Sequence, residues 1–209
     1  MNPELMTCQR LTAGILYPPL QIQMVDLNRL YAVITERYQY HNLTHLPDGV
    51  RMANPTGDCF IQTTRIQVNE AVVHFQASKE KCLDIFQIVS ERLNIQKYLT
   101  FGIKLTALLP LSKPDAAPQF TEAHLLAIRP DQWALLGPGR KGAGLRVVLH
   151  QDGIHDLRIE PFFNDTSQLY IELDVQHPEP FDSLEGIEEK MDSAYNYLFG
   201  NLKDFLASF

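Results

Sequence analysis

The chain contains few cysteines and no long apolar run. Its three cysteines, at positions 8, 59 and 82 of 209, are odd in number and widely separated, which argues against a disulfide framework or a cysteine-rich zinc site. No segment approaches the ~18 consecutive apolar residues that cross a bilayer. Residues 1–10 lack the basic-then-apolar order of a secretory signal. We therefore expect a cytoplasmic protein without a membrane partner.

An excess of basic residues is also missing. The formal net charge is −7, and all of it falls in the second half, where nine Lys and Arg stand against sixteen Asp and Glu in residues 98–209. Residues 1–97 carry nine of each sign. Nucleic-acid binders need a basic surface that displaces counterions from phosphates. The composition therefore speaks against a nucleic-acid partner.

Known catalytic motifs are absent as well. The sequence has no Gly-x-Ser-x-Gly elbow, no Rossmann glycine fingerprint and no zinc-protease helix. His41 and His45 are four residues apart, but Asn42 stands where such a helix would need glutamate. We expect no catalytic residue, no metal and no cofactor, and the residues favour a protein without enzymatic activity over an enzyme.

What the chain does contain is a clear order of strands and helices. In the first half the pattern predicts a strand over 10–22, a helix capped by Asp26, a connection over 41–49, strands at 50–54, 59–68 and 71–76, and a helix capped by Ser78. In the second half it predicts a strand over 99–111, a helix near 121–128, strands at 145–151, 154–161 and 168–176, and a helix from Asp182 to Phe209. Gly200 interrupts this last helix, so we expect close packing there.

These elements give one β-α-β-β-β-α plan twice. The sequence therefore predicts an α+β fold: a mainly antiparallel sheet covered by helices, in a single globular domain over 1–209 with two pseudo-repeats, 1–97 and 98–209. Chance recurrence of a common α+β pattern is the alternative, because residue identity between the halves is low.

Two known families resemble this plan. The doubled order is similar to that of the TATA-binding protein, which implies a curved saddle-shaped sheet. A Pro18-Pro19-Leu20 strand end, the acidic strand Ile171-Glu172-Leu173-Asp174-Val175 and a long C-terminal amphipathic helix resemble a sporadically distributed family of uncharacterised prokaryotic proteins. The run Gly102-Ile103-Lys104-Leu105 departs from that family, whose members often carry Arg-Tyr-Ile-Asn in a middle strand. The resemblance implies a fold and an accessory gene, with a partner encoded nearby.

A glycine-rich loop and two histidines form the first group of candidate site residues. The loop 137–144 (GPGRKGAG) offers backbone N–H groups beside Arg140 and Lys141, which could cradle an anion, although it lacks the Walker spacing. His150 and His155 flank Asp152-Gly153, and a two-residue turn would pair them on one face of a hairpin. The simpler interpretations are a connecting loop and a polar hairpin.

The second group lies on one predicted strand. Tyr170, Glu172 and Asp174 share its polar face, so they could face a partner. Paired carboxylates also serve acid–base chemistry or bind cations, but no further ligand is evident. We therefore expect a protein-binding or regulatory accessory protein, and the alternative is a binder or enzyme for a small, nucleotide-like anion that uses the sheet concavity.

Overall fold

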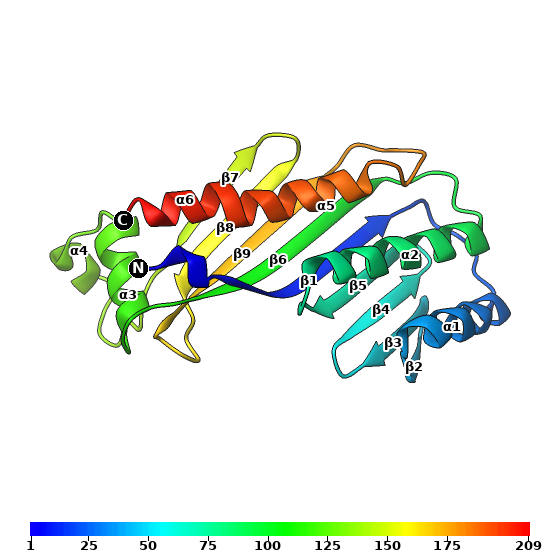
Figure 1. Ribbon diagram of the computed structural model, residues 1–209, viewed down its shortest axis with the longest axis horizontal. Coiled ribbons are helices and arrows are strands. Elements are labelled where there is room, and N and C mark those ends of the chain that lie inside the picture. The colour runs from blue at the N-terminus through cyan, green and yellow to red at the C-terminus, as the bar shows by residue number, and fades with distance from the viewer.

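The computed structural model describes residues 1–209 and has the α+β fold that the sequence predicts, with one antiparallel sheet and helices packed against it (Figure 1). Nine strands lie in the order β2-β3-β4-β5-β1-β6-β9-β8-β7. The strands are β1 Thr7–Leu16, β2 Asn42–Leu46, β3 Gly49–Asn54, β4 Gly57–Gln62, β5 Arg65–Ala71, β6 Thr100–Pro110, β7 Leu145–His150, β8 Ile154–Pro161 and β9 Gln168–His177.

Three long helical segments and several short ones accompany the sheet. The long segments are α1 Met24–Tyr38, α2 Phe75–Leu93, and α5 Ile187–Asn196, which runs through a π-turn at Tyr197–Asn201 into α6 Leu202–Ala207. The short ones are the 3₁₀ turn Pro3–Leu5, α3 Ala116–Phe120 with a π-turn at Thr121–Leu125, and α4 Pro130–Ala134. None of the helices has both the length and the apolar character needed to span a membrane.

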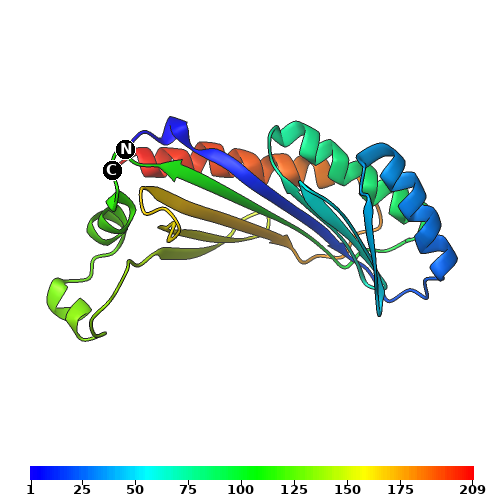
Figure 2. The ribbon, with the colours of Figure 1, turned by 90° about the horizontal axis from the view of Figure 1, so that it is seen from below.

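The sheet has one covered face and one open face. Along β6 every second side chain is buried, and the same alternation runs along β9. Helices α1, α2 and α5–α6 all lie on one side, while the segment that carries α3 and α4 lies beyond one end of the sheet (Figure 2). Within this segment α3 still packs against the core and against Phe209, and α4 hangs below the sheet. Period-two alternation is the pattern of a sheet that packs on a core with one face only.

The covered face forms a hydrophobic core that runs through both halves of the chain. It joins 40 buried residues, among them Tyr17, Phe86 and Phe101. Lys79 ties two of the covering helices together, because its ammonium lies 2.9 Å from Glu188 and 2.7 Å from Asp192 across the gap between α2 and α5. The helices are therefore attached to the sheet by packing and to each other by ion pairs.

The two halves meet at the centre of the sheet, where β1 pairs with β6. Outward from this pair, β5, β4, β3 and β2 follow on one side, and β9, β8 and β7 follow on the other. The first half has five strands and not the four predicted. Residues 42–46, expected to be a connection, pair with β3 as β2, and the division of 59–68 into two strands offsets the loss of 71–76. A duplicated origin for the two halves stays a prediction.

Several element boundaries differ from the expectation, beginning with β1, which runs over Thr7–Leu16 and not over 10–22. The predicted strand over 59–68 is two strands, since a turn at 63–64 separates β4 from β5, and residues 71–76 are not a strand, since α2 begins at Phe75. Helix α1 begins at Met24, two residues before the predicted cap Asp26. Helix α5 begins at Ile187, five residues after the predicted start Asp182. The helix expected near 121–128 is instead α3 with its π-turn, over 116–125. Helix ends depend on tertiary contacts that no local cap signal contains.

The expected close packing at Gly200 is wrong. A Cβ atom built there would have no neighbour within 4 Å, and the residue lies in the π-turn Tyr197–Asn201. The π-turn inserts one residue into the helix and so realigns its apolar side chains with the sheet.

Candidate functional site

The open face of the sheet carries mainly polar side chains, and none of the three long helical segments covers it. We define the open face by the side chains that the register places opposite the buried ones: Arg10, Thr12, Gly14, Leu16, Arg51, Ala53, Asp58, Phe60, Gln62, Arg65, Gln67, Asn69, Thr100, Gly102, Lys104, Thr106, Leu108, Arg146, Val148, His150, Ile154, Asp156, Arg158, Glu160, Tyr170, Glu172, Asp174 and Gln176. It draws on strands from both halves of the chain. A ligand on this face would contact β5, β1, β6 and β9 together.

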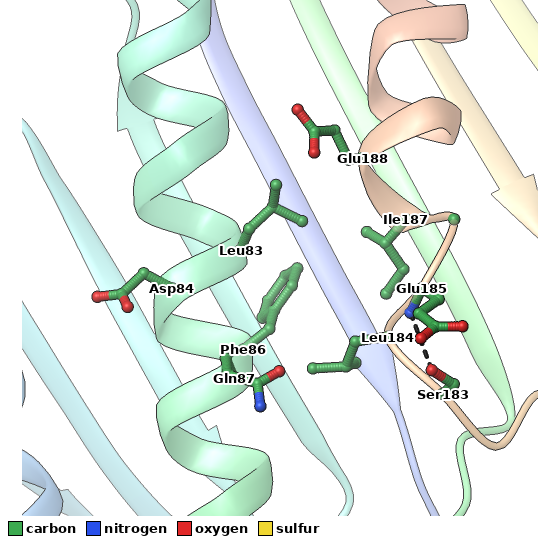
Figure 3. Close-up of a pocket in the computed structure, with 10 residues that line it drawn as sticks. Leu83, Asp84, Phe86, Gln87, Ser183, Leu184, Glu185, Ile187 and Glu188 are labelled. Atoms are coloured by element: carbon green, nitrogen blue, oxygen red, sulfur yellow. Dashed lines mark hydrogen bonds between the residues drawn. The ribbon is translucent and has the colours of Figure 1, made fainter.

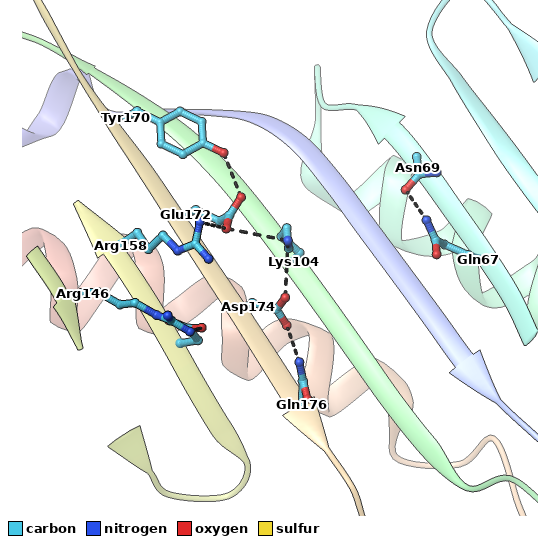
Figure 4. A network of polar contacts seen from close by, with 10 residues as sticks. Gln67, Asn69, Lys104, Arg146, Arg158, Tyr170, Glu172, Asp174 and Gln176 are labelled. Atoms are coloured by element: carbon cyan, nitrogen blue, oxygen red, sulfur yellow. Dashed lines mark hydrogen bonds and ion pairs between the residues drawn. The ribbon is translucent and has the colours of Figure 1, made fainter. Parts of the chain in front are cut away.

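Lys104 organises the second half of the open face (Figure 4). Its ammonium lies 3.7 Å from a Glu172 oxygen and 3.4 Å from an Asp174 oxygen, on the neighbouring strand β9. Arg158 approaches Glu172 to 3.7 Å from the other side, and the Tyr170 hydroxyl donates to Glu172 at 2.8 Å. Glu172 is therefore held by three groups and is only 14% exposed.

The network also affects how Tyr170 titrates. Burial comes first and the hydrogen bond to Glu172 second in raising the pKa of Tyr170 above its usual value. At the far side of the network, Arg146 donates two hydrogen bonds to Asp156, at 2.8 and 2.6 Å, and these bonds lower the pKa of that carboxyl. Asp156 is thus paired with Arg146, as Glu172 and Asp174 are paired with Lys104.

Charges on the open face nearly balance, unlike those of the whole chain. Its basic residues are Arg10, Arg51, Arg65, Lys104, Arg146 and Arg158, and its acidic residues are Asp58, Asp156, Glu160, Glu172 and Asp174. Most of them form ion pairs with one another. The negative net charge of the protein therefore lies elsewhere, and the open face offers a mixed pattern of fixed polar groups.

A shallow trough crosses the centre of the open face. Gly14 of β1 and Gly102 of β6 are directly opposite each other, so the trough has a floor of bare backbone. Its volume is about 410 Å3, and Arg65, Lys104 and Asp174 stand on its rim. Isolated glycines within strands often mark a place where a ligand or another backbone approaches closely.

Neither glycine is required by the backbone or by its neighbours. Both have ordinary φ angles, since the positive-φ glycines are at 137, 139, 142 and 186. A Cβ atom at Gly102 would find Val175 O at 3.8 Å, and one at Gly14 would find Ile66 O at 3.4 Å, which are normal contact distances. Room therefore exists for side chains that the sequence does not place there.

The first half of the open face carries an aromatic ring between two arginines. The guanidinium carbons of Arg51 and Arg65 lie 5.8 and 5.7 Å from the centre of the Phe60 ring. Arg51 also pairs with Asp58 at 2.7 Å, whereas Arg65 donates to Gln62 at 2.5 Å. Stacked Arg and aromatic side chains are common at interfaces, because both present flat, rigid surface.

The structure brings together one group of predicted site residues. Tyr170, Glu172 and Asp174 lie on the open face as the alternation of β9 indicates, and the network above connects them. Lys104, Arg158 and the two glycines were missed. Their only signal was a polar or glycine position within an alternating strand, and the sequence does not show which strands are neighbours.

The predicted pairing of His150 with His155 is wrong. In the β7–β8 hairpin His150 pairs with Ile154, and His155 pairs with Leu149. The loop therefore holds Gln151 as well as Asp152 and Gly153, and this one-residue shift sends the two imidazoles to opposite faces. His150 is exposed, while His155 is only 1% exposed and lies beside Tyr197, under the C-terminal helix.

Arg140 and Lys141 lie apart from both histidines. Arg140 donates two hydrogen bonds to Glu122, at 2.9 and 2.8 Å, and stacks over Trp133 at 4.3 Å, so its charge is already engaged. Lys141 is exposed on the loop before β7, whereas His150 lies at the far end of that strand, roughly 16 Å along at ~3.3 Å per residue. The four residues predicted to bind an anion do not form one site.

A second hollow lies on the helix side, between α2 and the start of α5 (Figure 3). It has a volume of about 570 Å3, with Phe86, Leu184 and Ile187 toward its floor and Asp84, Glu185 and Glu188 around it. Asp84 is held by Arg37 and Tyr38 through hydrogen bonds of 2.6–2.8 Å. The apolar residues belong to the packing between the two helices.

The cysteines and acidic clusters add little chemistry. Burial raises the pKa of Cys8 to about 11, and it raises the pKa values of Cys59 and Cys82 still further, so the thiols remain protonated near neutral pH. No group of three or more His, Cys, Asp and Glu side chains has the arrangement of a metal site.

No protein-family model matches this chain, and no curated protein is significantly similar to it in sequence.

Proposed function

We propose that this protein is a non-catalytic binding protein and that the open face of its sheet receives another protein. The observation that carries the proposal is the central trough, where Gly14 and Gly102 leave bare backbone although side chains would fit. Fixed polar groups on both sides of the trough would orient a bound partner. The partner would be a protein whose surface presents an extended or narrow segment to the trough.

The charge pattern favours a protein over a nucleic acid. A phosphate backbone requires a field of one sign, and here the acidic side chains Glu172, Asp174 and Asp156 lie among the basic ones. Protein partners, in contrast, are recognised by complementary mixed charges that set orientation and register. Arg10 and Arg65 are not paired with a carboxylate, so carboxylates of a partner could meet them.

The small-anion alternative has weaker support. Arg140, Lys141 and His150 are spread over different parts of the second half, and His155 is buried on the other face. Arg65 and Lys104 do stand at the trough, but Lys104 is occupied by two carboxylates. Thermal-shift measurements with nucleotides and inorganic phosphate would favour this alternative if they raised the melting temperature.

Partner capture with matched variants tests the proposal. The bait is the full chain, and the comparison variant is Gly102→Trp, which fills the trough from a strand position with free space. Gln87→Trp fills the hollow between α2 and α5 and serves as the control. We expect a stoichiometric partner with wild type and with the control, and its loss with Gly102→Trp. Equal capture by all three baits would contradict the proposal.

A further inference from the structure

The outer edge of β7 is a second surface that the fold leaves unsatisfied. β7 is the last strand of the sheet and pairs only with β8, so alternate N–H and C=O groups along its other side have no strand partner. Figure 1 shows β7 at the margin of the sheet. Such an edge is a template for another strand.

The side chains of β7 do not protect this edge. Leu145, Val147 and Leu149 point to the helix side and are half-buried, and Val148 is 50% exposed on the open face. Edges are commonly blocked by free charges, by proline or by a covering segment. The one charged side chain within the strand, Arg146, is bonded to Asp156 on β8.

The opposite edge of the sheet is built differently. β2 has five residues against six in β7, its sequence Asn42–Leu46 is largely polar, and Leu43 packs against the core. The second half has no long helix in the corresponding place, because the segment between β6 and β7 holds only the short helices at 116–134, beyond the end of the sheet. The two edges of one sheet therefore differ in polarity and in cover.

We propose that β7 pairs antiparallel with β7 of a second copy of this chain, with Val147 on the two-fold axis. Directly opposed residues of an antiparallel pair share a face, so a symmetric pair must be centred on a residue. Centring on Val147 sets Leu145 against Leu149 of the second copy and continues the apolar layer. Arg146 then lies opposite Val148 of the second copy.

The neighbouring register is less favourable. Centring on Val148 would place Leu145 opposite Gln151 of the second copy, which sets an apolar side chain against a polar one and interrupts the apolar layer. A six-residue strand pair buries less surface than the ~1,600 Å2 of a standard stable interface. The dimer is therefore reversible and depends on protein concentration.

Cross-linking of single cysteines tests the register. Cys59 and Cys82 have no exposed surface, so a Cys8→Ser background leaves the introduced thiol as the accessible one. We expect Val147→Cys to form a covalent dimer upon mild oxidation, since the register places this cysteine directly opposite the same cysteine of the second copy. Val148→Cys should remain monomeric because Arg146 faces it. A monomeric Val147→Cys protein, or equal cross-linking at both positions, would overturn the proposal.

Sedimentation velocity over a range of concentrations tests the dimer itself. Wild type should shift from monomer to dimer as its concentration rises, and Val148→Arg should weaken the shift at least tenfold, because it opposes Arg146 of the second copy. Thr44→Arg, at the opposite edge, is the matched control and should dimerise as wild type does. A wild-type protein that stays monomeric at every concentration would refute self-pairing. A complex at this edge that forms only with a different protein, and never between two copies of this chain, would also refute it.

Discussion

Replacement of the trough glycines by alanine should make the protein more stable. Glycine in the middle of a strand destabilises a fold by roughly 0.5–1 kcal/mol relative to alanine, because the unfolded chain is more flexible. At Gly102 the new methyl group would meet nothing nearer than Val175 O, at 3.8 Å, so no strain offsets this gain. We expect Gly102→Ala to raise the free energy of unfolding by about 0.5–1 kcal/mol, or the melting temperature by about 1–4 °C.

Urea unfolding followed by far-UV circular dichroism measures this change. Gly49→Ala is the matched control, because its methyl group would lie 2.0 Å from Ile61 O and must destabilise the protein. Gly14→Ala should behave like Gly102→Ala, since its nearest contact is at 3.4 Å. If Gly102→Ala lowered the midpoint as Gly49→Ala does, the trough glycine would be structural, and the main argument for a binding role would be lost.

Three further predictions concern buried ionisable groups. The double variant Glu188→Gln/Asp192→Asn should lower the free energy of unfolding in urea by about 1–3 kcal/mol, because it leaves the Lys79 ammonium, which is 3% exposed, charged and without an ion-pair partner. Lys79→Met removes that charge and should cost less; equal losses would contradict the prediction. The pKa of His177 lies below 6.5, first because the side chain is buried and second because of Lys190, so its contribution to stability is complete above pH 6.5 and is lost as the pH falls. His177→Gln should therefore flatten the decline in melting temperature between about pH 7.5 and 5.5. His150→Gln is the control, and an unchanged slope in His177→Gln would refute the prediction. Native thiol titration at pH 8 should label Cys59 and Cys82 only after denaturant is added, since both side chains have no exposed surface; rapid native labelling would show that the first half opens.

Strands with one buried face and one exposed face could be predicted from the sequence, because their side chains alternate between apolar and polar. β6 and β9 alternate because each has one covered and one open face, and their bounds match the expectation within one residue. β2 was missed because its largely polar sequence lacks that alternation. Its strand conformation depends on pairing with β3, which is a tertiary contact.

The hairpin register could not be predicted locally for a similar reason. Asp152-Gly153 favours a two-residue turn, but in the structure His177 donates from Nδ1 to the Asp152 carbonyl at 2.9 Å. The Ser193 hydroxyl, from α5, also donates to the Asp152 carboxylate at 3.2 Å. Contacts from β9 and α5 thus hold a three-residue loop, and they decide on which face each histidine lies.

One part of the candidate site could be predicted from the sequence, and the other part could not. Alternation along β9 places Tyr170, Glu172 and Asp174 on one face, and the sequence alone shows this. That Lys104 lies beside them, and that Gly14 lies opposite Gly102, depends on the order of strands in the sheet. The choice of which face the helices cover is likewise a property of the whole fold.

Binding of the captured partner to purified variants tests the central proposal most directly. Isothermal titration of the partner into wild type, Gly102→Trp and Gln87→Trp would compare the open face with the helix side. We expect wild type and Gln87→Trp to bind with the same affinity, and Gly102→Trp to bind at least tenfold more weakly. Unchanged affinity for Gly102→Trp, with Gln87→Trp impaired, would place the binding surface on the helix side and contradict the account.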